Sequence, residues 1–141
     1  MGKINLGWVV LGGLLAGLII NIGEYVCNGV LLATQWANAM AALNRPAPGT
    51  ESIAFYLLLT FVLGIFSVWV YAAIRSRFGA GPMTAICAGL IVWFLVSAYI
   101  NTSMLPLHIF PRRLLLYSTL WELVEFPIAI LVGAWIYREK A

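Results

Sequence analysis

The sequence contains no aspartate and little charge of either sign. Its 141 residues include five acidic residues, all of them glutamate, and eight lysines and arginines. Charged residues make up 9% of the chain and hydrophobic residues 63%, whereas soluble domains average about 25% and 45–50%. Because so few polar side chains cannot cover a water-soluble globule, we expect an integral membrane protein with one domain, residues 1–141. The small net charge of +3 gives no indication of nucleic-acid binding.

Cysteine and histidine are also scarce, which limits the chemistry that the chain offers. Cys27 and Cys87 lack the paired spacing of zinc or redox sites, and we interpret both as small buried residues. The single histidine, His108, cannot supply two axial ligands to haem. No arrangement of serine, cysteine or lysine indicates a catalytic nucleophile. The sequence therefore identifies no cofactor and favours a protein that is not an enzyme.

Long apolar segments are what the sequence has in abundance. Four of them can be drawn, at residues 6–32, 53–74, 83–105 and 114–137. Each is long enough to cross a hydrocarbon core of about 30 Å as a helix that rises 1.5 Å per residue. We predict an all-α protein, an antiparallel bundle of four transmembrane helices. Residues 33–43 are rich in helix formers, and they either continue the first helix or lie in the membrane interface.

Positive charge in the connections predicts the orientation of these helices. One side of the membrane would carry five basic residues and the other side three, because alternate connections lie on the same side. The five are Lys3, Arg75, Arg77, Arg138 and Lys140, and the three are Arg45, Arg112 and Arg113. Cytoplasmic segments carry the excess of lysine and arginine. This asymmetry favours cytoplasmic termini.

A stripe of small and polar residues runs along the first apolar segment. Its members follow one another in steps of four, four, three and four residues, and they are Gly13, Gly17, Asn21, Glu24 and Asn28. Steps of this size place all five on one face of a helix. A carboxylate that faces lipid is costly, so we expect this face to look into protein or water.

The other three segments carry comparable stripes. The fourth segment has Ser118, Glu122 and Glu125 followed by Ala129 and Gly133, while Gly64, Gly89 and Asn101 mark the second and third segments. Small residues at such spacings let helix backbones approach closely in lipid. We therefore predict helix packing at Gly13, Gly17, Gly64, Gly89, Ala129 and Gly133. Gly12 lies off the first stripe, and we expect a large residue there to cost less than one at Gly17.

The polar members of the stripes are the candidate binding residues. They are Asn21, Glu24, Asn28, Asn101, Ser118, Glu122 and Glu125. No lysine or arginine lies inside any apolar segment to pair with the glutamates. Three alternatives remain: the carboxyl groups carry protons, they are satisfied by neighbouring amides and hydroxyls, or they hold a cation or metal ion.

Two parts of the chain carry short motifs. Asn5, Gly23-Glu24-Tyr25, Trp36 and Met40 lie in the N-terminal third, and the sequence Gly-Ala-Trp-Ile-Tyr occupies residues 133–137. In these motifs the chain resembles small bacterial four-helix integral membrane proteins that contain a domain of unknown function. The resemblance implies four membrane helices and no assigned activity, and it carries over no functional residue.

Three functions are compatible with the sequence. The first is binding or conduction of a small solute, proton or cation by a homo-oligomer, since one short bundle is too thin to enclose a wide pathway. The second is an accessory subunit of a larger membrane complex. The third is a membrane metalloenzyme, because Glu122 and Glu125 lie one turn apart and Glu24 can face them. The sequence does not decide among the three, and the lipid bilayer is the one partner that it indicates directly.

Overall fold

The computed structural model describes residues 3–139 of the chain. Within these residues there is no β-strand, and four helical spans are long and apolar enough to cross a membrane. The spans are Leu6–Leu31, Thr50–Phe78, Pro82–Leu107 and Arg112–Ile136. The prediction of an all-α integral membrane protein is thereby confirmed.

Two of the four spans change helix type part-way. The first comprises α1 (Leu6–Glu24) and a π-helical segment, η1 (Tyr25–Leu31), and is followed by the short helix α2 (Ala33–Ala42). The second is one helix, α3 (Thr50–Phe78). The third comprises α4 (Pro82–Trp93), the π-helical η2 (Phe94–Ala98), α5 (Tyr99–Met104) and the 3₁₀ turn η3 (Leu105–Leu107). The fourth is α6 (Arg112–Ile136).

The helix ends follow from local sequence. The second span reaches beyond the predicted residues 53–74 at both ends, because polar residues continue the helix outside the apolar segment. It ends at Gly79, whose φ of +84° is a conformation that glycine adopts readily. Leu32 leaves helical geometry with φ −107° and ψ 9°, so α2 is a separate helix rather than a straight continuation of α1.

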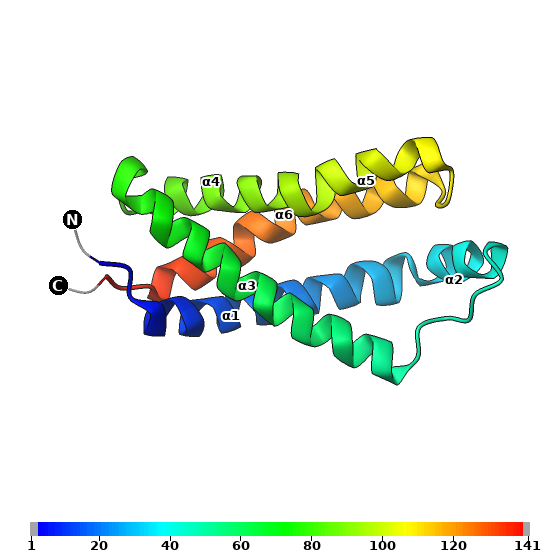
Figure 1. Ribbon diagram of the computed structural model, residues 1–141, viewed down its shortest axis with the longest axis horizontal. Helices are drawn as coiled ribbons and strands as arrows, with labels where there is room; N and C mark the ends of the chain where they lie inside the picture. Colours follow the sequence, from blue (N-terminus) through cyan, green and yellow to red (C-terminus); the bar gives the residue numbers. More distant parts are fainter. Residues whose placement is uncertain (1–2, 140–141) are drawn as a thin grey trace.

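Helix α6 lies between the first and third spans. It packs against α1 on one side and α4 on the other, while α3 crosses α1 obliquely (Figure 1). The beginning of α1 and the end of α6 meet at one end of the molecule. There the Asn5 backbone N–H donates to the Tyr137 hydroxyl at 3.3 Å, and Arg75 pairs with Glu139 at 3.5 Å.

Glycines set the spacing of α1 and α3. A Cβ atom on Gly13 would overlap the backbone of Ile65, and one on Gly17 would lie 2.9 Å from the Phe61 Cα. From the other side, Gly64 faces the backbone of Gly13 and Gly17. The two backbones therefore touch directly, as small residues at helix interfaces allow.

The glycines of α6 and α4 make equally close approaches, and one of them involves a residue outside the predicted stripe. Gly133 packs against Gly12, where an added Cβ would lie 2.5 Å from the Gly133 carbonyl oxygen. The expectation that a large residue costs less at Gly12 than at Gly17 is wrong, because the α1–α6 contact occupies the helix face beside the stripe and is at least as close. Gly89 packs against the Pro127 backbone, and Ala129 is fully buried.

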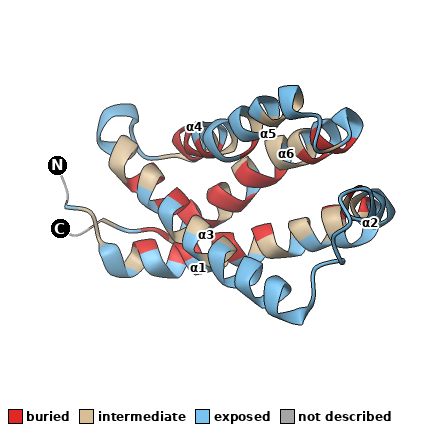
Figure 2. Cartoon of the chain, turned by 45° about the vertical axis from the view of Figure 1, so that its right-hand side comes forward, coloured by how far each residue is buried: buried red, intermediate tan, exposed pale blue. Residues whose placement is uncertain are grey.

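Burial is concentrated where the helices cross. The core lies in the half of the molecule that contains the chain ends, around Ala16, Ile20, Val68, Ala88 and Ile130. The other half is more open, and every residue from 51 to 59 at the start of α3 is exposed (Figure 2). A second, smaller core around Cys27, Leu32, Ala39 and Leu114 attaches α2 to α6.

Candidate functional site

The carboxyl group of Glu125 lies against the backbone of α1. Its side chain is only 8% exposed, and it occupies the space that Gly23 leaves by having no side chain. A Cβ atom on Gly23 would lie 2.6 Å from Oε1 of Glu125 and 2.9 Å from Oε2. Gly23 therefore forms one wall of the Glu125 site, a role that the stripe pattern did not predict because Gly23 falls between its steps.

Neither oxygen of Glu125 accepts a hydrogen bond from any of residues 3–139. Two polar groups on the same helix are also buried without a partner among these residues, the Ser118 hydroxyl and the Trp121 indole N–H. A buried polar atom without a hydrogen bond costs free energy, and a buried unpaired charge costs more. The environment of Glu125 therefore calls for a compensating group.

Two further carboxylates lie within electrostatic range of Glu125. They belong to Glu24 at the end of α1 and to Glu122, one turn earlier on α6. We call these three residues the acidic cluster. The only ion pair within residues 3–139 joins Arg75 to Glu139 at the other end of the molecule, so no cationic side chain in this part of the chain neutralises the cluster.

Glu24 is anchored by a hydrogen-bonded chain that runs toward α2. The Asn28 side-chain amide donates to the Glu24 carboxylate, and the Trp36 indole N–H donates to the Asn28 oxygen at 2.7 Å. Asn28 thus orients the Glu24 carboxylate, and Trp36 of α2 in turn orients Asn28. Sequence reasoning missed this role of Trp36, because its partner lies on the other side of the break at Leu32.

Asn101 belongs to a different network, between the third span and α6. Its amide donates to the Thr119 hydroxyl at 2.8 Å and more weakly to the Ser97 hydroxyl at 3.4 Å. Trp93 donates to the Thr119 carbonyl oxygen at 2.9 Å. Ser97 also lies beside Glu122, so this network borders the acidic cluster. Thr119 was not among the predicted residues, since it lies one position away from the Ser118 stripe.

Asn21 and Ser118 differ in their surroundings. The Asn21 amide donates to the Leu57 carbonyl oxygen of α3 at 3.3 Å, and this contact is exposed. Ser118 is buried on α6, one turn before Glu122. The structure therefore brings Glu24, Glu122 and Glu125 together with Asn28 as support, and it places Asn21 and Asn101 in separate helix contacts.

Both π-helical segments lie next to the acidic cluster. η1 begins directly after Glu24 and contains the buried Cys27, while η2 contains the buried Ser97. π-helical turns within α-helices are rare and occur often at functional sites. Cys87, by contrast, is exposed on α4, so the prediction of two buried cysteines is wrong for this residue.

The cluster does not have the form of a metal centre. Among residues 3–139 no three histidine, cysteine or acidic side chains are placed so that they could hold one metal ion. The described part of the chain thus lacks the ligand set that a metalloenzyme of the predicted kind would use.

Comparison of the chain with protein-family models, with curated proteins and with solved structures finds no match. The site is therefore interpreted from its own chemistry.

Proposed function

We propose that this protein binds or conducts a proton or a small cation through the acidic cluster, within a small polytopic membrane bundle. One observation carries the proposal: both oxygens of the buried Glu125 lack a hydrogen-bond partner among residues 3–139, although two more carboxylates lie within electrostatic range. If all three carboxyl groups of the acidic cluster were ionised, their negative charges would repel one another across an apolar interior. Protons or a bound cation relieve that repulsion without any cationic side chain.

A proton is the ligand that the geometry supports best. A metal ion needs several oxygen or nitrogen ligands at fixed distances, and no three histidine, cysteine or acidic side chains among residues 3–139 form such a set. A proton needs only one carboxyl oxygen and a neighbouring acceptor. Other small solutes are accommodated less well, because Gly23 and Glu125 fill the space between α1 and α6.

The proposed protein is an antiparallel four-helix bundle in a bacterial inner membrane, with both termini in the cytoplasm. In this orientation the acidic cluster lies in the outer half of the bilayer. A homo-oligomer fits the exposed start of α3, where residues 51–59 contact no other part of the chain closely enough to become buried. A second copy would enclose a path that one bundle is too thin to form.

An accessory subunit of a larger membrane complex is the second candidate. The same exposed residues of α3 favour it, because they include large apolar side chains such as Phe55, Tyr56 and Leu58. A larger assembly would cover them with a different protein. Purification in mild detergent separates the two candidates: a homogeneous small oligomer supports the first, and a stable heteromeric assembly supports the second.

The proposed function is tested by infrared difference spectroscopy of the purified protein in lipid. We expect a protonated carboxyl band at neutral pH that disappears when the pH is raised or when a competing cation is added. Glu125→Gln and Glu122→Gln retain side-chain shape and hydrogen bonding, so both variants should fold and lose this response. Glu51→Gln, at an exposed residue in the first turn of α3, is the matched control and should retain it.

A wild-type spectrum without a protonated carboxyl band would contradict the proton-binding proposal. If, in addition, the glutamine variants left cation binding unchanged, the cluster would serve packing alone.

A further inference from the structure

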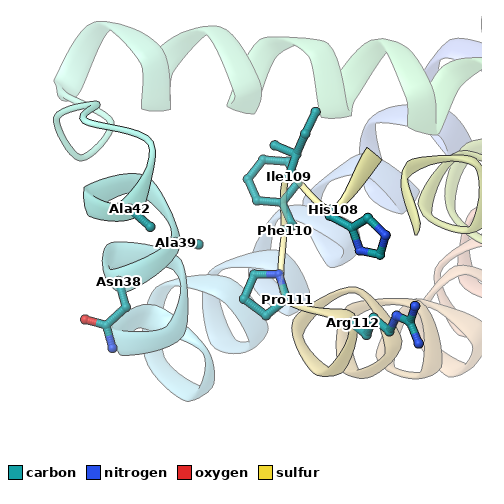
Figure 3. Close-up of a pocket in the computed structure, with 8 residues that line it drawn as sticks. All are labelled: Asn38, Ala39, Ala42, His108, Ile109, Phe110, Pro111 and Arg112. Atoms are coloured by element: carbon teal, nitrogen blue, oxygen red, sulfur yellow. The ribbon is translucent and has the colours of Figure 1, made fainter. Parts of the chain in front are cut away.

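A second feature of the molecule lies away from the acidic cluster, where α2 meets the connection before α6. Here the chain forms an open groove of about 430 Å³ (Figure 3). Ala39 and Ala42 of α2 form one wall, and Phe110 and Pro111 form the other. His108 and Arg112 lie together on the side of the groove away from α2. The volume falls within the range of about 300–1,000 Å³ that is typical of small-molecule sites.

The groove has a cationic end that no acidic side chain neutralises. Arg112 forms no ion pair within residues 3–139, and the imidazole of His108 beside it is exposed. Arg112 is also the first residue of α6, whose N-cap Pro111 provides no side-chain cap. The first backbone N–H groups of α6 therefore have no partner in the helix, and they add to the positive potential of the Arg112 guanidinium.

The rest of the groove is apolar and lies at the membrane boundary. α6 is a membrane span that begins at Arg112, so the cationic end of the groove is at the depth of the lipid headgroups. An edge-to-face contact between Trp36 of α2 and Phe110, with ring centroids 5.5 Å apart, links the two walls of the groove. Aromatic residues are enriched at this depth in membrane proteins.

We propose that this groove binds a phospholipid with an anionic headgroup. The phosphate would lie at Arg112 and His108, where a guanidinium forms charge-assisted hydrogen bonds with phosphate oxygens. The first part of an acyl chain would lie along Ala39, Ala42 and Phe110. A headgroup with net negative charge is preferred to a zwitterionic one, because the groove contains no carboxylate to receive a cationic amine. This lipid would join α2 to α6 from outside.

The test measures lipid retention by native mass spectrometry. Delipidated protein is incubated in detergent with phosphatidylglycerol, with phosphatidylcholine, or with phosphatidylglycerol and excess inorganic phosphate. We expect stoichiometric phosphatidylglycerol on the wild-type protein, much less phosphatidylcholine, and little displacement by inorganic phosphate.

Two variants locate the site. Arg112→Gln removes the charge, and Ala42→Trp fills the groove from an exposed position. Arg112→Gln should lower phosphatidylglycerol retention about tenfold, the change expected when one charge-assisted hydrogen bond is lost, and Ala42→Trp should lower it because the indole ring occupies the space of the acyl chain. Arg113→Gln and Ala41→Trp are the matched controls, because each is a neighbouring exposed residue that does not line the groove. Both controls should retain the lipid.

Three results would overturn the proposal. Equal retention by Arg112→Gln and Arg113→Gln would place any bound lipid elsewhere, and equal retention of the two lipids would remove the anionic preference. Displacement of the lipid by the excess inorganic phosphate would show a simple anion site. If Ala42→Trp failed to fold, the arginine pair alone would decide.

Discussion

Gly23 and Glu125 show how much a single residue without a side chain contributes to the site. The Glu125 carboxyl rests on the α1 backbone only because Gly23 carries no Cβ atom. The atoms that a methyl group would displace are the end of a flexible side chain rather than backbone. A substitution at Gly23 should therefore act on the position of the carboxyl group and little on the fold.

Gly23→Ala tests this directly. We expect the free energy of unfolding to change by less than about 1 kcal/mol, since alanine also favours the helix. The carboxyl band in the infrared spectrum should shift or lose its response to pH, because Glu125 is moved from its site. Gly29→Ala is the control in the same span, where the new methyl faces only the exposed Tyr25 ring. An unchanged carboxyl band in Gly23→Ala would show that the Gly23 contact does not determine the state of Glu125.

The sequence predicted which carboxylates would come near one another better than which residues would surround them. Glu24, Glu122 and Glu125 were identified from spacing and from the cost of a carboxylate in lipid, and the structure brings them together. Gly23, Trp36 and Thr119 were missed. Their roles depend on how neighbouring helices rotate against one another and on the break in the helix at Leu32, and neither is encoded in the periodicity of one segment.

At the scale of helices, α1 contacts its neighbours through close approach of the backbones rather than through large apolar side chains. Two faces of α1 make close contacts through glycine. Gly13 and Gly17 pack against α3, and Gly12 packs against α6. Without a hydrophobic driving force between helices in lipid, such packing supplies much of their association. A methyl group at these contacts must separate the two backbones.

We predict that Gly12→Ala and Gly13→Ala each destabilise the protein by about 1–3 kcal/mol, as overpacking does in other cores. Gly7→Ala is the control, because its new Cβ would meet only the Asn5 side chain at 3.5 Å. Thermal unfolding in detergent measures the difference. If the three variants unfolded at the same temperature as the wild type, the helices would not approach closely at Gly12 and Gly13.

The spans were predictable because their length and apolar composition are fixed by the bilayer. Their internal changes of helix type were not. The sequences of η1 and η2 predict ordinary α-helix, and the π-helical geometry is visible only in the backbone of the structure. The face assignments shift accordingly: within η1, Cys27 is buried, whereas Asn28 on the predicted face is only half-buried.

At the scale of the whole molecule, the proposed orientation rests on the basic residues in the connections. We predict that single cysteines at positions 48 and 77, in a protein without Cys27 and Cys87, react from opposite sides of the membrane. The cysteine at 48 should react with an impermeant reagent in intact cells, because the connection that contains Arg45 carries less positive charge. Labelling at 77 but not at 48 would reverse the proposed orientation.

The position of α6 between α1 and α4 also bears on how the chain is assembled during synthesis. α6 is the least hydropathic of the four spans and brings two of the three clustered carboxylates. It is also the last of the four to leave the ribosome. By then the other three spans, including Gly23 and Asn28, are already available in the membrane. We therefore expect the least hydropathic span to enter the membrane beside the other three spans. The acidic cluster would be completed only when α6 is inserted.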